Sequence, residues 1–151
     1  MQKLGLGIVG INNGHIHGMV SGLLKTGRAE SLYDYWDDRI AAELDARAEA
    51  TGAQAIVNCA SAEYFRAARA DLLKTPVITP VFLDEKGGAP KVISFFAKRA
   101  RGAFARFVIE RRVTDPAALT AFAWEGYAYQ PADSTPDAPV FLRREVLQKA
   151  S

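Results

Sequence analysis

Apolar and polar positions repeat with a helical period most clearly in one stretch of this 151-residue chain, between residues 32 and 48. Apolar side chains recur there at every fourth position: Leu32, Trp36, Ile40, Leu44 and Ala48. That spacing predicts one amphipathic helix. Ser31 and Asp34 are placed to cap its start, and Gly52 is placed to end it.

Other segments show shorter patterns that predict strands and brief helices. Strands are expected over residues 3–9 and 55–58, on both sides of the turn at 85–88, and as a pair within 126–144. Helices are expected over 15–27, 62–70 and 97–112, and after the start signal Asp115–Pro116. We therefore predict an α/β protein with a mixed sheet and packed helices. In it, the strand and helix of residues 3–27 join the sheet that contains 55–58 and the strands around 85–88.

Composition is ordinary for a soluble globular protein: 49% of the residues are apolar and 24% are charged. The length predicts a single domain over residues 1–151. Cys59 is the one cysteine, so no internal disulfide is expected. No secretory signal or membrane-length apolar run is present in the sequence, which favours a cytoplasmic protein without membrane partners. The net charge of +2 is too small to indicate a polyanion partner by itself.

The chain begins with a glycine-rich turn, "GIVGINNGHIHG" at residues 7–18. Gly10, Gly14 and Gly18 are candidate NAD-binding positions, because glycines let backbone amides approach a pyrophosphate. Residues 3–30 resemble the Rossmann N-terminus of the glucose-fructose oxidoreductase and inositol dehydrogenase family. The spacing departs from the dinucleotide fingerprint, and the expected ribose ligand would be Asp37 or Asp38, inside the predicted helix.

The same turn contains His15 and His17, which raise the question of a metal site. Residues two apart on a helix do not face one another, and no cysteine or carboxylate cluster lies nearby in the sequence. We therefore expect no metal site.

Four later blocks resemble the C-terminal half of the YaaA family of bacterial peroxide-stress proteins: "SLYDYWDDRIAAEL", "VNCASAEYFRA", "PVFLDEKGGAPKVISFFAKRARGAFARFVIERRV" and "EGYAY". The resemblance implies an α/β fold particular to that family, a role in limiting peroxide and iron damage, and DNA binding through a positive cleft. Arg111 departs from the pattern, because the family has an asparagine there. With residues 1–30 resembling another family and 31–151 this one, the sequence reads as a fusion or an engineered chimera.

The predicted helix over residues 97–112 gives the DNA hypothesis a physical basis. Its apolar residues gather on one side, and its cations on the other: Lys98, Arg99, Arg101, Arg106 and Arg112. Such a face suits a phosphate backbone and carries no sequence preference. The alternative is the solvated outer face of an ordinary amphipathic helix.

A second candidate site follows the strand over residues 55–58. Asn58, Ser61 and Glu63 are candidates to bind a nucleobase edge while Tyr64 stacks on it. The alternative is a turn and helix cap with Tyr64 in the core. Tyr127 and Tyr129 alternate on a predicted strand, where packing is the commoner role.

These observations favour a peroxide-stress protein that binds DNA weakly and without sequence preference, and they assign no catalytic residue. Two alternatives stay open: a truncated or chimeric dinucleotide-binding module of the oxidoreductase type, and a folded domain without a ligand.

Overall fold

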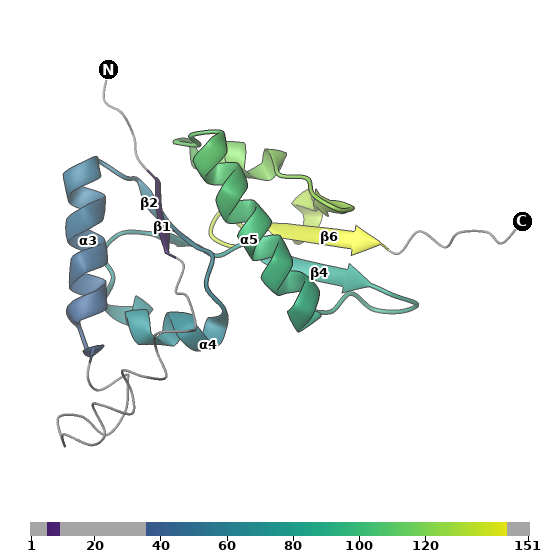
Figure 1. Cartoon of the computed structure of the whole chain (residues 1–151), viewed down its shortest axis with the longest axis horizontal. Helices are drawn as coiled ribbons and strands as arrows, with labels where there is room; N and C mark the ends of the chain where they lie inside the picture. Colours follow the sequence, from purple (N-terminus) through teal and green to yellow (C-terminus); the bar gives the residue numbers. More distant parts are fainter. Residues whose placement is uncertain (1–5, 10–35, 145–151) are drawn as a thin grey trace, which may run out of the picture. The chain divides into compact units, whose positions relative to one another are not determined.

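The computed structural model describes residues 6–9 and 36–144 of the chain (Figure 1). These residues form two compact units, Met1–Val77 and Ile78–Ser151, each of which combines helices with a three-stranded sheet. The α/β class predicted from the sequence is therefore confirmed. The prediction of a single domain stays a prediction.

The first unit contains strands β1 (Leu6–Val9), β2 (Ala55–Asn58) and β3 (Val77–Ile78) in the order β1-β2-β3. β1 runs parallel to β2, with Leu6 beside Ala55. Helix α3 (Arg39–Thr51) packs against both of these strands (Figure 1). All four residues of β2 are buried: the apolar run Ala55–Val57 predicts this for the first three, and Asn58 is a buried polar residue.

The helix predicted from Ser31 to Gly52 is correct at its end and wrong at its start. Gly52 takes a left-handed conformation with φ of 65°, and the amide of Ala53 donates to the carbonyl of Ala48 at 2.8 Å. The backbone breaks into a turn at Asp37, whose φ of 39° is incompatible with a continuous helix. Ser31 and Leu32 lie outside the described residues.

A run of short helices follows β2: α4 (Ala62–Phe65) and the 3₁₀ segments η1 (Arg66–Ala68) and η2 (Ala70–Leu72). The predicted cap is confirmed, because the Ser61 hydroxyl accepts a hydrogen bond from the Tyr64 amide at 3.4 Å. The run changes direction at Arg69, which is left-handed with φ of 46°.

The second unit is built on strands β4 (Val81–Glu85), β5 (Tyr127–Tyr129) and β6 (Val140–Arg144), in the order β4-β6-β5. β4 is parallel to β6, and β5 is antiparallel to it. The β5–β6 pair confirms the strand pair predicted within 126–144. The short segments η3 (Pro116–Ala121) and η4 (Pro131–Asp133) connect these elements, and Asp115 caps η3 by accepting from the Ala117 amide at 2.9 Å.

The single sheet predicted around residues 85–88 is wrong in two respects. β3 and β4 belong to different sheets, because Pro80, which has no amide hydrogen for a ladder, separates them. After the turn, only Lys91 pairs with β4, through its bridge to Asp84, and the chain becomes helical at Ser94.

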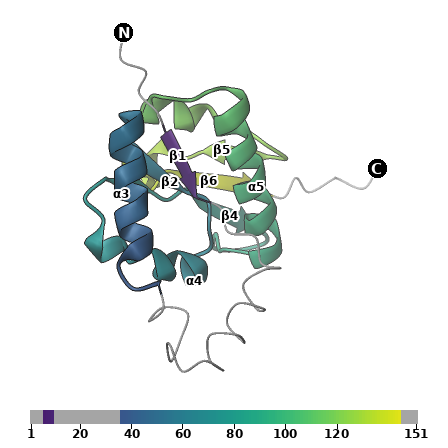
Figure 2. The same ribbon diagram turned by 60° about the vertical axis from the view of Figure 1, so that its left-hand side comes forward.

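Helix α5 (Ser94–Glu110) covers the core of the second unit (Figure 2). It buries Ala97, Ala100, Phe104 and Val108. The Phe104 ring is fully buried, and its centre lies 5.9 Å from that of Phe82 and 5.5 Å from that of Phe141. Alternation along β4 and β6 points Phe82 and Phe141 to this helix as stacked neighbours.

Candidate nucleic-acid interface

The predicted division of α5 into an apolar side and a cationic side is confirmed. Lys98, Arg99 and Arg106 are exposed, and Arg101 is half-buried. The helix begins three residues earlier than predicted, at Ser94, so it carries Phe95 and Phe96 in its first turn.

Two of these cations have carboxylate partners. The Arg99 Nη2 atom donates to Glu125 Oε1 at 2.8 Å, and Arg106 Nε lies 3.9 Å from Glu110 Oε1. Glu125 is 26 residues from Arg99 in the sequence, so helical spacing gave no sign of it. Among residues 36–144, Lys98 forms no ion pair, which leaves its charge for solvent or a ligand.

Arg112 lies beyond the end of α5, contrary to the prediction of a helix over 97–112, and DNA binding by Arg112 stays a prediction. The helix ends at Glu110, and Arg112 is left-handed with φ of 49°. Its amide donates to the Ile109 carbonyl at 3.2 Å, and the Val113 amide donates to Val108 at 3.0 Å. This is the Schellman arrangement, in which glycine is the usual left-handed residue. The sequence contains no glycine there, which explains why the end of the helix was placed two residues too late.

Residues in the first two turns of α5 form part of a row of aromatic rings and guanidinium groups. We name it the arginine–aromatic row, and its members in order are Trp124, Arg99, Phe95, Phe96, Arg143 and Tyr127. Arg99 Cζ lies 5.2 Å from the centre of the Trp124 ring and 5.8 Å from that of Phe95. These distances are in the range of cation–π attraction.

The row continues from Phe95 toward the sheet. The centres of the Phe95 and Phe96 rings are 5.3 Å apart, in an edge-to-face pair. Arg143 Cζ lies 3.7 Å from the Phe96 centre and 5.2 Å from that of Tyr127. Sequence spacing gives no sign of this row, because its members come from α5, β5, β6 and the segment before β5.

A buried carboxylate holds the inner end of the row. Asp84 accepts a hydrogen bond from Arg143 Nε at 2.6 Å and another from the Tyr127 hydroxyl at 2.9 Å. The parallel register of β4 and β6 places Asp84 beside Arg143. Burial, followed by the hydrogen bond to Asp84, raises the pKa of Tyr127 well above its ordinary value of 10.0. Tyr127 is therefore a buried anchor, in line with the packing role expected from its position on a strand.

The residues proposed to bind a nucleobase lie at the end of β2 and the start of α4. Asn58 is buried, and its Oδ1 atom accepts from the Ala60 amide at 2.9 Å. Ser61 caps α4, Glu63 is exposed and Tyr64 is half-buried. Asn58 and Ser61 thus hold the backbone turn, and base binding by these four residues stays a prediction.

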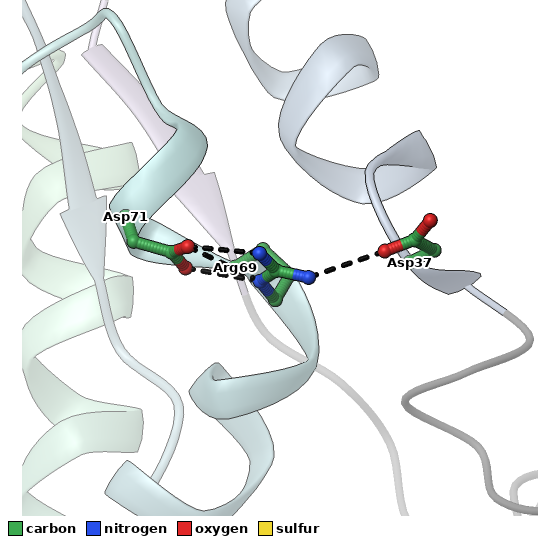
Figure 3. A network of polar contacts seen from close by, with 3 residues as sticks. All are labelled: Asp37, Arg69 and Asp71. Carbon is green, nitrogen blue, oxygen red and sulfur yellow. Dashed lines mark hydrogen bonds and ion pairs between the residues drawn. The ribbon is translucent and has the colours of Figure 1, made fainter.

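Arg69 forms a polar network that sequence spacing did not indicate (Figure 3). Its Nη2 atom donates to Asp71 Oδ2 at 2.9 Å, and its Nη1 atom donates to Asp37 Oδ1 at 3.1 Å. The hydrogen bonds from Arg69 lower the pKa of Asp71. Asp37, considered above as a ribose ligand, therefore pairs with a cation that joins two left-handed turns.

The other candidate ligands of the glycine-rich turn, Gly10, Gly14 and Gly18, lie outside the described residues, as do His15 and His17. In the described part of the chain, no group of three or more histidine, cysteine or acidic residues is arranged to hold a metal ion. None of the helices in that part is both long enough and apolar enough to span a membrane.

The fold and this interface define a small α/β protein with a cationic helix, and sequence comparison identifies its family. Residues 19–133 match the family model described as "Peroxide stress protein YaaA". The chain therefore belongs to the YaaA family. The match begins at residue 19, ahead of the boundary predicted at residues 30 and 31. Nothing in the comparisons supports an oxidoreductase N-terminus or a fusion. Glycine spacing without its structural context is a weak signal of a dinucleotide-binding domain.

Curated relatives agree with this assignment. A UPF0246 protein of Ruegeria pomeroyi is 57% identical over 120 residues, which cover 80% of this chain and 47% of the relative. A UPF0246 protein of Cereibacter sphaeroides is 60% identical over 120 residues, with the same coverage. The chain thus spans about half the length of the curated relatives it matches.

Proposed function

We propose that this chain acts in the peroxide-stress response and that α5 binds DNA weakly and without sequence preference. The observation that carries the DNA proposal is the solvent face of α5, where Lys98 and Arg106 are exposed and Glu110 is the only carboxylate of the helix. A polyanion binds such a face because each lysine or arginine that meets a phosphate releases counterions.

The contacts of α5 rank its cations as phosphate ligands. Lys98 is the strongest candidate because it forms no ion pair within residues 36–144. Arg106 is next, since its 3.9 Å contact with Glu110 is long and both side chains are well exposed. Arg99 is the weakest, because Glu125 neutralises it at 2.8 Å.

The test is fluorescence anisotropy with a short labelled DNA across a salt series. If Lys98, Arg101 and Arg106 each neutralise one phosphate, log affinity falls against log salt with a slope of about −3. The double substitution Lys98→Ala and Arg106→Ala should weaken binding and flatten the slope by about 2.

The matched control changes the same net charge elsewhere. Arg47 and Lys74 are exposed residues of the first unit, and the variant Arg47→Ala with Lys74→Ala should keep the slope of the parent chain. Equal weakening by both variants would show that net charge, and not α5, governs binding. No binding by the parent chain would remove the DNA proposal and leave the folded domain without a ligand as the better account.

DNA binding connects the chain to oxidative damage in a simple way. A protein held on DNA by α5 is positioned where reaction of iron with peroxide harms the genome, and we propose that this chain contributes to limiting that damage and intracellular iron. The test is survival in peroxide of a bacterial strain that lacks its YaaA-family gene and expresses this chain. The parent chain should raise survival, and the Lys98→Ala, Arg106→Ala variant should raise it less. Equal survival with and without the chain would contradict the proposal.

A further inference from the structure

We propose that Phe95 is a stacking platform for an unpaired base, so that α5 binds a single strand of DNA more tightly than the same sequence as a duplex. This inference rests on the proposed function of α5 and names the form of nucleic acid that the helix prefers. Duplex DNA presents phosphates to α5 but hides the flat faces of its bases, whereas a single strand presents both.

Exposure of Phe95 makes it accessible to a base. The residue is 65% exposed, although it lies in the first turn of a helix whose opposite side is the core. A single exposed apolar residue is ordinary by itself. Ile109, near the other end of the same helix and 64% exposed, is such a residue and has no aromatic ring on which a base could stack.

Neighbouring groups hold Phe95 in place. Arg99 lies 5.8 Å from its ring centre, and Glu125 fixes Arg99 through an ion pair of 2.8 Å. Phe96 is the other neighbour of Phe95. Arg143 stacks on the Phe96 ring, and its Nε atom lies 2.6 Å from Asp84 Oδ1. One ion pair anchors Arg99 and another anchors Arg143 over Phe96, so stacking a base on the Phe95 ring orders few further groups, which lowers the entropic cost of binding.

Charge and space beside Phe95 fit a nucleotide strand. Lys98 lies one helical turn further along the same face and is free to meet a phosphate. Gly102 lies two helical turns beyond Phe95 on that face. A Cβ placed on Gly102 would have no neighbouring atom within 4 Å. The helix surface therefore offers a ring for a base, a cation for the adjacent phosphate and open space for the backbone. An acidic peptide would satisfy the cation but gain no stacking from the ring.

The experiment compares three labelled DNAs: an oligothymidylate, the same strand with abasic sites in place of its bases, and an oligothymidylate–oligoadenylate duplex. The parent chain should bind the base-bearing strand several-fold more tightly than the other two. Phe95→Ala should weaken binding of that strand by about 5- to 10-fold, the lower part of the range for loss of one stacked base. Affinity for the abasic strand and the duplex should change by less than about 2-fold, and the salt slope should not change, because no cation is lost.

Control variants separate stacking from apolar contact and from folding. Phe95→Tyr should keep the preference because its ring stacks, and Phe95→Leu should lose it although it is apolar. Ile109→Ala should behave as the parent chain. In a Trp36→Phe background, Trp124 reports directly on the row, and its fluorescence should be quenched by the base-bearing strand alone.

The outcomes distinguish this inference from the function on which it rests. Loss of single-strand preference in Phe95→Ala and Phe95→Leu, with retention in Phe95→Tyr, would support it. A parent chain that binds all three DNAs equally, or a Phe95→Leu variant that keeps the preference, would overturn it while α5 remains a DNA-binding helix. A parent chain that binds none of the three would overturn both proposals.

Discussion

Helices α3 and α5 end in the same way but use their charges differently. Each closes with a left-handed residue, Gly52 or Arg112, followed by an amide that donates to the carbonyl five residues back. In α3, Arg47 pairs with Glu43 at 2.7 Å, and the Asp45 carboxylate accepts from the amides of Lys74 and Thr75, which lie just before β3. In α5, four cations accompany one carboxylate, Glu110.

The difference follows from what each helix buries. The buried residues of α3 are two alanines, Ala41 and Ala48, so this helix buries less apolar side chain than α5 does. The buried row of α5 includes Phe104, which fills an aromatic core. A helix held by its core depends less on its surface charges for stability, and in α5 the charge of Lys98 is left for a ligand.

The largest expected effect is on the core under α5. Phe104→Ala should lower the free energy of unfolding by about 3–5 kcal/mol, because it removes a fully buried ring and leaves a cavity. Leu44→Ala in α3 removes a half-buried side chain and should cost about 1–2 kcal/mol. Urea unfolding followed by circular dichroism measures both. Equal costs would break the comparison of the two helices.

Two ion pairs join β4 to β6 at successive positions of the register, one buried and one exposed, and they give a matched test of the buried anchor. Asp84 and Arg143 are 5% and 21% exposed, whereas Glu85 and Arg144 are 38% and 65% exposed. Asp84→Ala leaves Arg143 and Tyr127 without their partner and should cost about 2–4 kcal/mol. Glu85→Ala should cost less than about 1 kcal/mol. Thermal unfolding of the two variants checks this, and a larger loss in Glu85→Ala would contradict the assignment of Asp84 as the anchor of the row.

Tyr127 in the second unit and Asp45 in the first should respond to opposite ends of the pH scale. The pKa of Tyr127 is raised by burial, so its contribution to stability is fully present below pH 10.0 and is lost as the pH rises above that value. The pKa of Asp45 is lowered by hydrogen bonds from the Lys74 and Thr75 amides, so its contribution is present above pH 3.8 and is lost as the pH falls below it.

Two variants test this pH dependence. Tyr127→Phe should cost about 1–2 kcal/mol at neutral pH through the lost hydrogen bond and should flatten the alkaline loss. Asp45→Asn should flatten the acidic loss. Melting temperatures across the pH range measure both effects, and an unchanged alkaline limb in Tyr127→Phe would show that another group is responsible for it.

The smallest effects should come from the two helix ends, with opposite signs. Gly52→Ala places a Cβ on a left-handed residue and should lower the free energy of unfolding by about 1 kcal/mol. Arg112→Gly removes the strain of a Cβ in the same left-handed conformation and should raise the free energy of unfolding by about 0.5–1 kcal/mol. Arg112→Lys keeps both charge and Cβ and should change little. Destabilisation by Arg112→Gly would mean that the arginine side chain, and not the backbone, holds this end.

The sequence by itself determined the features that depend on a few consecutive residues. Gly52 marked the end of α3, Ser61 and Asp115 marked two helix starts, and periodicity identified the buried side of α5. Each of these signals acts within about one helical turn, where the residue that stops or caps an element meets its own backbone. The cationic face of α5 could therefore be predicted, including Lys98 and Arg106.

Only the tertiary structure decided which distant residues meet on that face. Arg99 pairs with a carboxylate 26 residues away, and Asp84 meets Arg143 across 59 residues because β4 and β6 are parallel neighbours. The packing of α5 beside the segment before β5 sets the first pairing, and strand order and register set the second. Neither is encoded in the spacing of adjacent residues. The separation of the strands into two sheets and the arginine–aromatic row arise for the same reason, since each depends on how whole elements pack once they have formed.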